Sequence, residues 1–319
     1  MTHPRLFARS NRDLPRVALG TPLFLALLTL WFAPCTLLAQ SAQLPDAENI
    51  LDRYIDVTGG RAAYQKIHNR VTKERLEHVG MGFVDRVTTY AAEPNKRFFT
   101  LESDALGAVT NGSNGEIAWY LSDGTGPLVE TGQARDAALD LAAFDLMLNW
   151  RKYSKQVECA GIDSIDGRDC YKINLIPNHG EPETRFYDKE SGLLVRLFMT
   201  RLSSNMPAMK VQLSFDDYKP VGGLLLPHRR VQVVNMCGSP REMRIVTDSI
   251  QHNVDLPADR FDPPAEILEQ AKKIAAGDAE PQARPACNPS SETSTDQPGC
   301  GPAQPGKGCS PKKPDEDHP

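Results

Sequence analysis

Apolar and polar residues alternate through most of the chain between residues 71 and 250, and this period of two predicts β-strands. Turn-forming residues separate the first strands, as in Glu93-Pro94-Asn95 and Asn111-Gly112. The first strands are expected at residues 71–80, 83–92, 96–103, 107–112 and 116–122. Because no helix separates them, they must pair as an antiparallel meander.

A second group of strands follows, and its connections are equally short. These strands are expected at residues 154–163, 169–176, 183–188, 193–200, 207–216, 224–236 and 241–250. Asp166-Gly167 is typical of a hairpin turn. The segment DDYKPVGG comes directly after Phe215, so Asp216 and Asp217 are interpreted as turn residues between two strands.

Residues with helical spacing precede the first strand. Asp46 precedes the segment AENILDRYIDVTGG and is the expected N-cap, and Gly59-Gly60 is the expected helix end. A second short helix is expected in RAAYQKIH.

The longest helical pattern covers residues 134–150, between the two groups of strands. Ala137, Leu141, Phe144 and Leu148 recur on one face, which predicts a single helix lying on the sheet. A last amphipathic helix is expected in AEILEQAKKIAA, within residues 263–277. The fold class is therefore α+β, with an antiparallel sheet and a few helices.

Alternate residues of the later strands form a long apolar series that is expected to face inward. Taken strand by strand, they are Leu193, Val195, Leu197 and Met199, then Met209, Val211, Leu213 and Phe215, then Val231 and Val233. Five of the eight Met residues lie between residues 199 and 243, and flexible Met suits a surface that binds variable apolar groups. Two interpretations remain open: the wall of an apolar cavity, or ordinary core beneath the helices.

The two ends of the chain differ from the middle. Residues 1–39 combine four Arg with the apolar stretch LFLALLTLWFA, which predicts a signal peptide cleaved after Ala39 or Ser41. The alternative is an uncleaved segment that anchors the protein to the inner membrane. Residues 278–319 are rich in Pro, Gly, Ser and charge, so they are expected to be disordered.

Charge excludes one class of partner. The segment 1–39 carries four Arg and one Asp, so its removal changes the net charge from −5 to −8. An acidic exported protein has no electrostatic reason to bind nucleic acid.

The cysteines allow a disulfide, because an exported chain folds in an oxidising compartment. Cys159 and Cys170 flank the Asp166-Gly167 turn, and a bridge between them would need a bulge or a longer loop. Cys287, Cys300 and Cys309 lie in the tail. The Cys and His spacings match no zinc site, so neither a metal nor another cofactor is expected.

Catalytic patterns are missing from the sequence. No Gly-x-Ser-x-Gly segment is present, and no two His residues occur at ligand spacing. Asp216 and Asp217 are adjacent on an extended chain, so they point to opposite faces and do not form an acid–base pair. His228 follows Pro227 at a strand start and is expected to face solvent. A hydrolase is therefore the least favoured class.

Four segments carry a family resemblance: ILDRYIDVTGGRAAYQKIHNRVTK, DGRDCYKINLIP, TRFYDKESGLLVRL and FDDYKPVGGLLLPHRR. Together they make residues 46–262 resemble the outer-membrane lipoprotein-sorting proteins of LolA-like type. The resemblance implies a periplasmic protein with a strongly curved antiparallel sheet, an incomplete β-barrel lidded by helices. It also implies an apolar cavity for lipoprotein acyl chains or lipid, and protein partners at the inner and outer membranes.

Two hypotheses follow. The first is a non-enzymatic carrier that binds acyl chains and takes part in outer-membrane lipoprotein sorting. The second is an envelope sensor or scaffold that binds a protein partner through the same fold and the tail. The sequence does not determine the oligomeric state.

Overall fold

The computed structural model describes residues 44–105, 107–144, 146–236 and 238–278. The predicted signal peptide, the tail from residue 279 onward and its three cysteines lie outside the described residues. Within the described ranges, no helix is both long enough and apolar enough to span a membrane.

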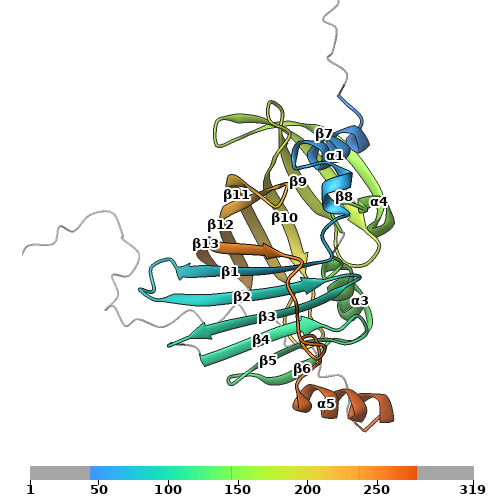
Figure 1. Ribbon diagram of the computed structural model, residues 1–319, viewed down its shortest axis with the longest axis vertical. Coiled ribbons are helices and arrows are strands. Elements are labelled where there is room, and N and C mark those ends of the chain that lie inside the picture. Colours follow the sequence, from blue (N-terminus) through green and yellow to red (C-terminus); the bar gives the residue numbers. More distant parts are fainter. Residues whose placement is uncertain (1–43, 106, 145, 237, 279–319) are drawn as a thin grey trace, which may run out of the picture. The chain divides into compact units, whose positions relative to one another are not determined.

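All strands of the described chain belong to one antiparallel sheet (Figure 1). The strands are β1 (Asn69–His78), β2 (Val84–Ala92), β3 (Lys96–Ser103), β4 (Gly107–Ser113), β5 (Ala118–Ser122), β6 (Gly126–Val129), β7 (Ser154–Ile165), β8 (Arg168–Pro177), β9 (Glu183–Asp188), β10 (Leu194–Arg201), β11 (Met209–Val221), β12 (Leu224–Met236) and β13 (Ser239–His252). Their order is β6-β5-β4-β3-β2-β1-β13-β12-β11-β10-β9-β8-β7, so two consecutive meanders meet where β1 pairs with β13. The sheet is strongly curved and its edges β6 and β7 stay apart, so the expected incomplete barrel is confirmed.

Five helices accompany the sheet in the described part of the chain. They are α1 (Ala47–Val57), α2 (Arg61–Tyr64), α3 (Gly132–Leu141), α4 (Trp150–Tyr153) and α5 (Ala265–Ala276). Asp46 caps α1 as predicted, because its side chain accepts a hydrogen bond from the backbone N–H of Glu48. In Figure 1, α1, α3 and α4 lie on one side of the curved sheet.

The single helix predicted at residues 134–150 is wrong. Helix α3 ends at Leu141, and turns connect it to the short helix α4. Phe144 packs beside Ile67 and Leu224, whereas Leu148 joins the core around α1. Tertiary packing therefore overrides the local helical pattern after Leu141.

The β11–β12 hairpin also differs from the prediction. Strand β11 continues to Val221, and the turn is formed by Gly222 and Gly223 alone, both with positive φ. Asp216 and Asp217 are therefore strand residues, although Asp217 has a φ of 54°. Asn111-Gly112, expected as a turn, lies inside β4.

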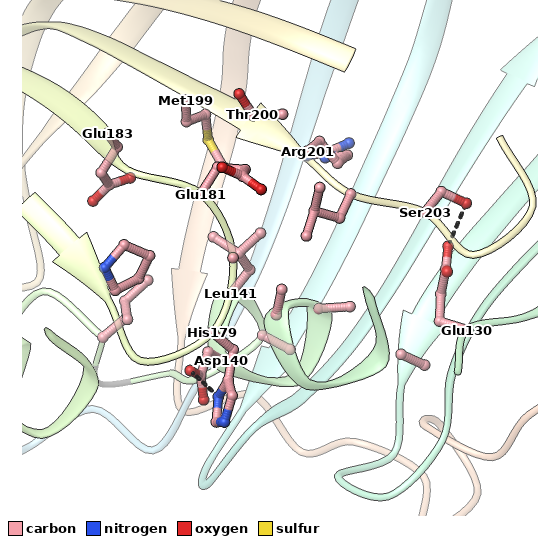
Figure 2. Close-up of a pocket in the computed structure, with 18 of the residues that line it drawn as sticks. Glu130, Asp140, Leu141, His179, Glu181, Glu183, Met199, Thr200, Arg201 and Ser203 are labelled. Carbon is pink, nitrogen blue, oxygen red and sulfur yellow. Dashed lines mark hydrogen bonds and ion pairs between the residues drawn. The ribbon is translucent and has the colours of Figure 1, made fainter. Parts of the chain in front are cut away.

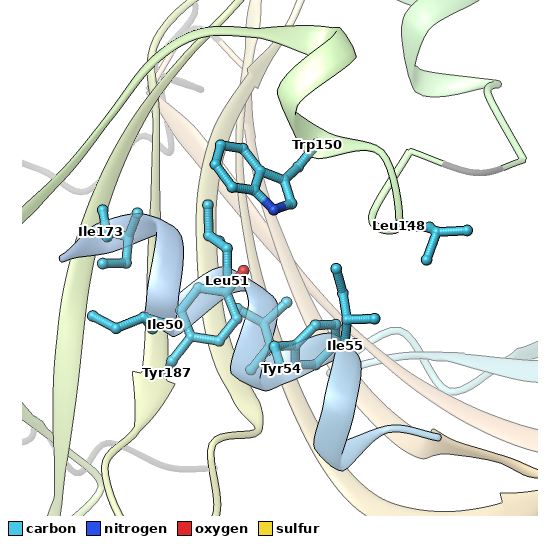
Figure 3. Close-up of a cluster of buried hydrophobic side chains, with 10 residues drawn as sticks. Ile50, Leu51, Tyr54, Ile55, Leu148, Trp150, Ile173 and Tyr187 are labelled. Atoms are coloured by element: carbon cyan, nitrogen blue, oxygen red, sulfur yellow. The ribbon is translucent and has the colours of Figure 1, made fainter. Parts of the chain in front are cut away.

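The largest core cluster holds α1 against the sheet (Figure 3). Its members are Ala47, Ile50, Leu51, Tyr54, Ile55, Leu148, Trp150, Ile173, Tyr187 and Leu194. The rings of Tyr54 and Tyr187 meet edge to face with centroids 5.5 Å apart. Since full burial of one large apolar side chain contributes about 1.5–3 kcal/mol, this cluster anchors α1 over β8, β9 and β10.

Helix α5 packs on the other half of the sheet. Its Ile267 is fully buried beside Trp119 of β5 and Val129 of β6, and Phe98 of β3 packs against the same cluster. The neighbouring strand residue Arg97 lines a cavity, so α5 covers the face opposite to that cavity near β3.

Candidate functional site

A cavity of about 450 Å³ lies between the sheet and the segment that runs from α3 to α4. Side chains from β8, β10 and β11 form one wall, and α3 with the turns after it forms the facing wall. The apolar lining includes Ala137, Leu141, Leu175, Leu197, Met206 and Leu213. This volume is within the range of small-molecule sites, which are typically apolar with a few polar groups.

Four of the ten residues predicted to face inward line this cavity. They are Leu197, Met199, Met209 and Leu213. Leu197 is directly opposite Leu213 across the β10–β11 pair, and directly opposite residues share a face of the sheet.

A bulge in β10 explains why the start of that strand does not contribute. The pairing between β9 and β10 shifts register between Leu194 and Arg196. An extra residue reverses the alternation of side chains, so Val195 faces away from the cavity and packs with Phe186 and Cys170. Leu193 lies in the turn before β10 and is half-buried.

The remaining predicted residues lie elsewhere. Val231 is opposite Ser214 and Val233 is opposite Gln212, so both occupy the face that Leu213 does not. Val211 is buried without lining the cavity, and Phe215 packs against the cluster around α1.

Cys159 and Cys170 do not form the bridge that the sequence allows. Both are free thiols in the structure. Across the β7–β8 pair, Cys159 is opposite Ile173 and Cys170 is opposite Asp163. The register of the two strands therefore does not place the two cysteines opposite each other. Burial raises the pKa of both thiols, which favours their protonated form.

Polar residues tie the walls of the cavity together (Figure 2). Glu130, directly after β6, accepts hydrogen bonds from the Ser203 hydroxyl (2.8 Å) and the Ser204 backbone N–H (2.6 Å). On the other side, Asp140 of α3 lies 2.8 Å from Nδ1 of His179 in the β8–β9 loop. These contacts join segments that are far apart in the sequence.

Three arginines also line the cavity, and the sequence reasoning missed them. Arg185 forms a buried ion pair with Glu183. Arg97 of β3 donates to the side-chain oxygen of Asn111 at 2.8 Å, and Arg201 ends β10. The alternation of residues in β10 could have identified Arg201, because it lies on the same face of the strand as Leu197 and Met199.

The electrostatic environment of Arg97 reflects its position. Burial, followed by the positive charges of Arg201 and Arg230, lowers the pKa of Arg97 to about 10. Desolvation also lowers the pKa of Arg201, although this residue as a whole is exposed to solvent. Both guanidinium groups remain protonated at neutral pH.

The titratable residues considered from the sequence lie outside this cavity. Asp217 forms an ion pair with Lys219 at 2.8 Å, which lowers the pKa of its carboxyl. His228 contacts the backbone oxygen of Leu226 through Nδ1. Across the described ranges, no three His, Cys, Asp or Glu side chains form a group able to hold a metal ion.

No protein-family model and no curated protein matches the chain. Solved structures do match. A LolA superfamily protein from Nitrosomonas europaea is 13% identical with a TM-score of 0.47, and the match covers 69% of this chain and 99% of that protein.

Two further solved structures have comparable values. An outer membrane lipoprotein-sorting protein domain from Vibrio parahaemolyticus is 13% identical with a TM-score of 0.47, over 68% of this chain and 97% of that domain. A DUF1329 family protein from Desulfovibrio piger is 12% identical with a TM-score of 0.46, over 70% of this chain and 99% of that protein. All three matches cover nearly the whole of the other protein and about two thirds of this chain.

Proposed function

We propose that this protein is a periplasmic, non-enzymatic carrier that holds the acyl chain of a lipid or lipoprotein in the cavity between α3 and the sheet. The observation that carries the proposal is the wall of Leu197, Met199 and Leu213 facing a hollow of about 450 Å³. When an acyl chain leaves a membrane, exposure to water costs about 0.8 kcal/mol of free energy for each methylene. An apolar cavity can offset this cost without any chemical step.

The Met residues support variable acyl chains as the ligand. Met199, Met206 and Met209 line one part of the cavity. Their unbranched side chains adopt several rotamers at low cost, so this wall can adapt to chains of different length. Delivery between the inner and outer membranes, with a protein partner at each, belongs to the same proposal.

The test is a cavity-filling substitution with a matched control on the same strand. Leu213→Trp places an indole in the cavity, whereas Lys210→Trp places one on an exposed site outside the lining. Leu213→Trp should weaken uptake of an apolar fluorescent dye by about tenfold or more, because the ring occupies the volume that the dye needs. Lys210→Trp should bind the dye as the wild type does.

Native mass spectrometry of protein purified from the periplasm provides the second readout. Wild-type protein should carry a lipid-sized mass, and Leu213→Trp should lose it. Equal dye binding by the two variants would place the binding site elsewhere. A lipid-free wild type that captures a protein partner only when residues 279–319 are present would favour the sensor or scaffold instead.

A further inference from the structure

The charged side chains that line the cavity differ in whether another group of the protein pairs with their charge. Glu183 pairs with Arg185, and Asp140 pairs with His179. Glu130 accepts two hydrogen bonds from the β10–β11 loop. The carboxylates of these three residues therefore have partners within the protein, whereas Glu181, the fourth acidic residue of the lining, is exposed to solvent.

Two arginines in the same lining have no carboxylate partner. Arg97 donates to the neutral side chain of Asn111 and lies over the ring of Phe99, with its guanidinium carbon 5.4 Å from the centroid. The side chain of Arg201 makes neither a hydrogen bond nor an ion pair with any residue that the structure describes, although its backbone belongs to the β10–β11 pair. In Figure 2, Arg201 lies at the end of β10 beside the cavity.

The two arginines come from strands on different halves of the sheet, β3 and β10, and both line the same cavity. The positive charge of Arg201 contributes to lowering the pKa of Arg97, which is the effect of a like charge nearby. An uncompensated cation in a partly desolvated site is unfavourable. A bound anion would relieve this cost.

We propose that the cavity binds an amphiphile with one anionic group, a carboxylate or a phosphate, which contacts Arg201 and Arg97 while its acyl chain lies along Leu197, Met199 and Leu213. This inference rests on the proposed carrier function and adds the charge of the ligand to it. A guanidinium presents a planar fork of donors that matches both anions. The apolar wall beside it disfavours a free anion as the natural ligand.

The inference makes a neutral lipid a poor ligand. A hydrogen bond to a charged group contributes more than one between neutral groups, so removal of the anion should cost about tenfold or more in affinity. Palmitate and hexadecanol have equal chain length and differ in the head group. Dipalmitoyl phosphatidic acid and dipalmitoyl glycerol provide the same comparison for phosphate.

The experiment measures displacement of an apolar dye by these four lipids and by inorganic phosphate alone, using wild type, Arg201→Gln, Arg201→Lys and Arg75→Gln. Arg75 pairs with Asp248 at 2.9 Å and is not part of the lining, so it is the matched control. At least one anionic lipid should bind about tenfold more tightly than its neutral partner in the wild type and in Arg75→Gln. Arg201→Gln should abolish this preference, and Arg201→Lys should retain part of it.

The outcomes separate the two proposals. Equal affinity for anionic and neutral lipids in the wild type, or an unchanged preference in Arg201→Gln, overturns the anionic ligand and leaves the carrier in place. Displacement by inorganic phosphate as strong as by the lipids also overturns it, because the acyl chain would then contribute nothing. Binding of neither dye nor lipid overturns both proposals. Circular dichroism of each variant checks that the Gln substitution has not unfolded the protein.

Discussion

Asp188, at the end of β9, is only 7% exposed, and its carboxylate accepts hydrogen bonds from the backbone N–H and the hydroxyl of Ser191. Burial alone would raise the pKa of this carboxyl, but the two bonds from Ser191, the charge of Arg168 and the backbone of Glu190 together lower it. The ionised side chain thereby holds the β9–β10 turn that precedes the bulge at Leu194 and Arg196. A single carboxylate thus helps to set the strand that lines the cavity.

We expect Asp188→Asn to reduce the free energy of unfolding by about 1–3 kcal/mol near neutral pH, because the amide cannot replace the charged acceptor. The folded pKa lies below the unfolded value, so the contribution of Asp188 is present above the unfolded pKa and is lost as the pH falls through the folded pKa. The difference between wild type and variant should therefore shrink below pH of about 4. Urea unfolding at several pH values measures it.

The control for this prediction is Asp104→Asn, at an exposed position in the turn after β3. Its effect should stay within about 0.5 kcal/mol at every pH. A constant difference between wild type and Asp188→Asn down to acidic pH would contradict the role given to Ser191.

At the scale of elements, helix α5 is joined to the sheet by side-chain packing. Ile267 is fully buried and Leu268, the next residue, is 39% exposed. The sequence interpretation treated residues 263–277 as a segment separate from residues 46–262. The packing of Ile267 on Trp119 and Val129 makes α5 part of the same folded unit.

Ile267→Ala should lower the free energy of unfolding by about 2–5 kcal/mol, the usual cost of removing a large buried aliphatic side chain. Leu268→Ala, on the exposed side of the same helix, should cost no more than about 0.5 kcal/mol. Chemical denaturation followed by circular dichroism compares the two. Similar small effects for both variants would show that α5 contributes little to the stability of the sheet.

At the scale of the whole described unit, the curved sheet is held at its open side by contacts between distant segments. Glu130 follows the edge strand β6, and Ser203 and Ser204 belong to the β10–β11 loop. Thr131 adds three bonds to Ser204: its backbone N–H and its hydroxyl donate to the Ser204 hydroxyl oxygen, and its carbonyl accepts from that hydroxyl. Such a connection can open locally while the strands remain paired.

Glu130→Ala should therefore increase amide hydrogen exchange in residues 202–208 by about tenfold or more, since the Ser204 N–H loses its acceptor. The melting temperature should change little. Exchange followed by mass spectrometry measures this, with the exposed Glu102→Ala as the control. Exchange that rises equally in β11 and β12 would instead indicate global destabilisation.

Much of the local structure follows from residue patterns. Alternation predicted every strand except β6, the Asp166-Gly167 turn is present with positive φ at both residues, and Asp46 caps α1. These features depend on interactions within a few residues, which the sequence contains directly. The segment AEILEQAKKIAA is helical for the same reason.

The face that each strand presents to the cavity depends on partners far along the chain. The bulge between Leu194 and Arg196 and the pairing of Val231 with Ser214 together decide which apolar residues point inward. A shift of one residue moves a whole strand's side chains to the other face, and no local pattern encodes that shift. The sequence alternation in β3 and β10 places Arg97 and Arg201 in series with apolar residues. The sequence does not show that the two strands face one cavity, because that depends on how the whole sheet curves.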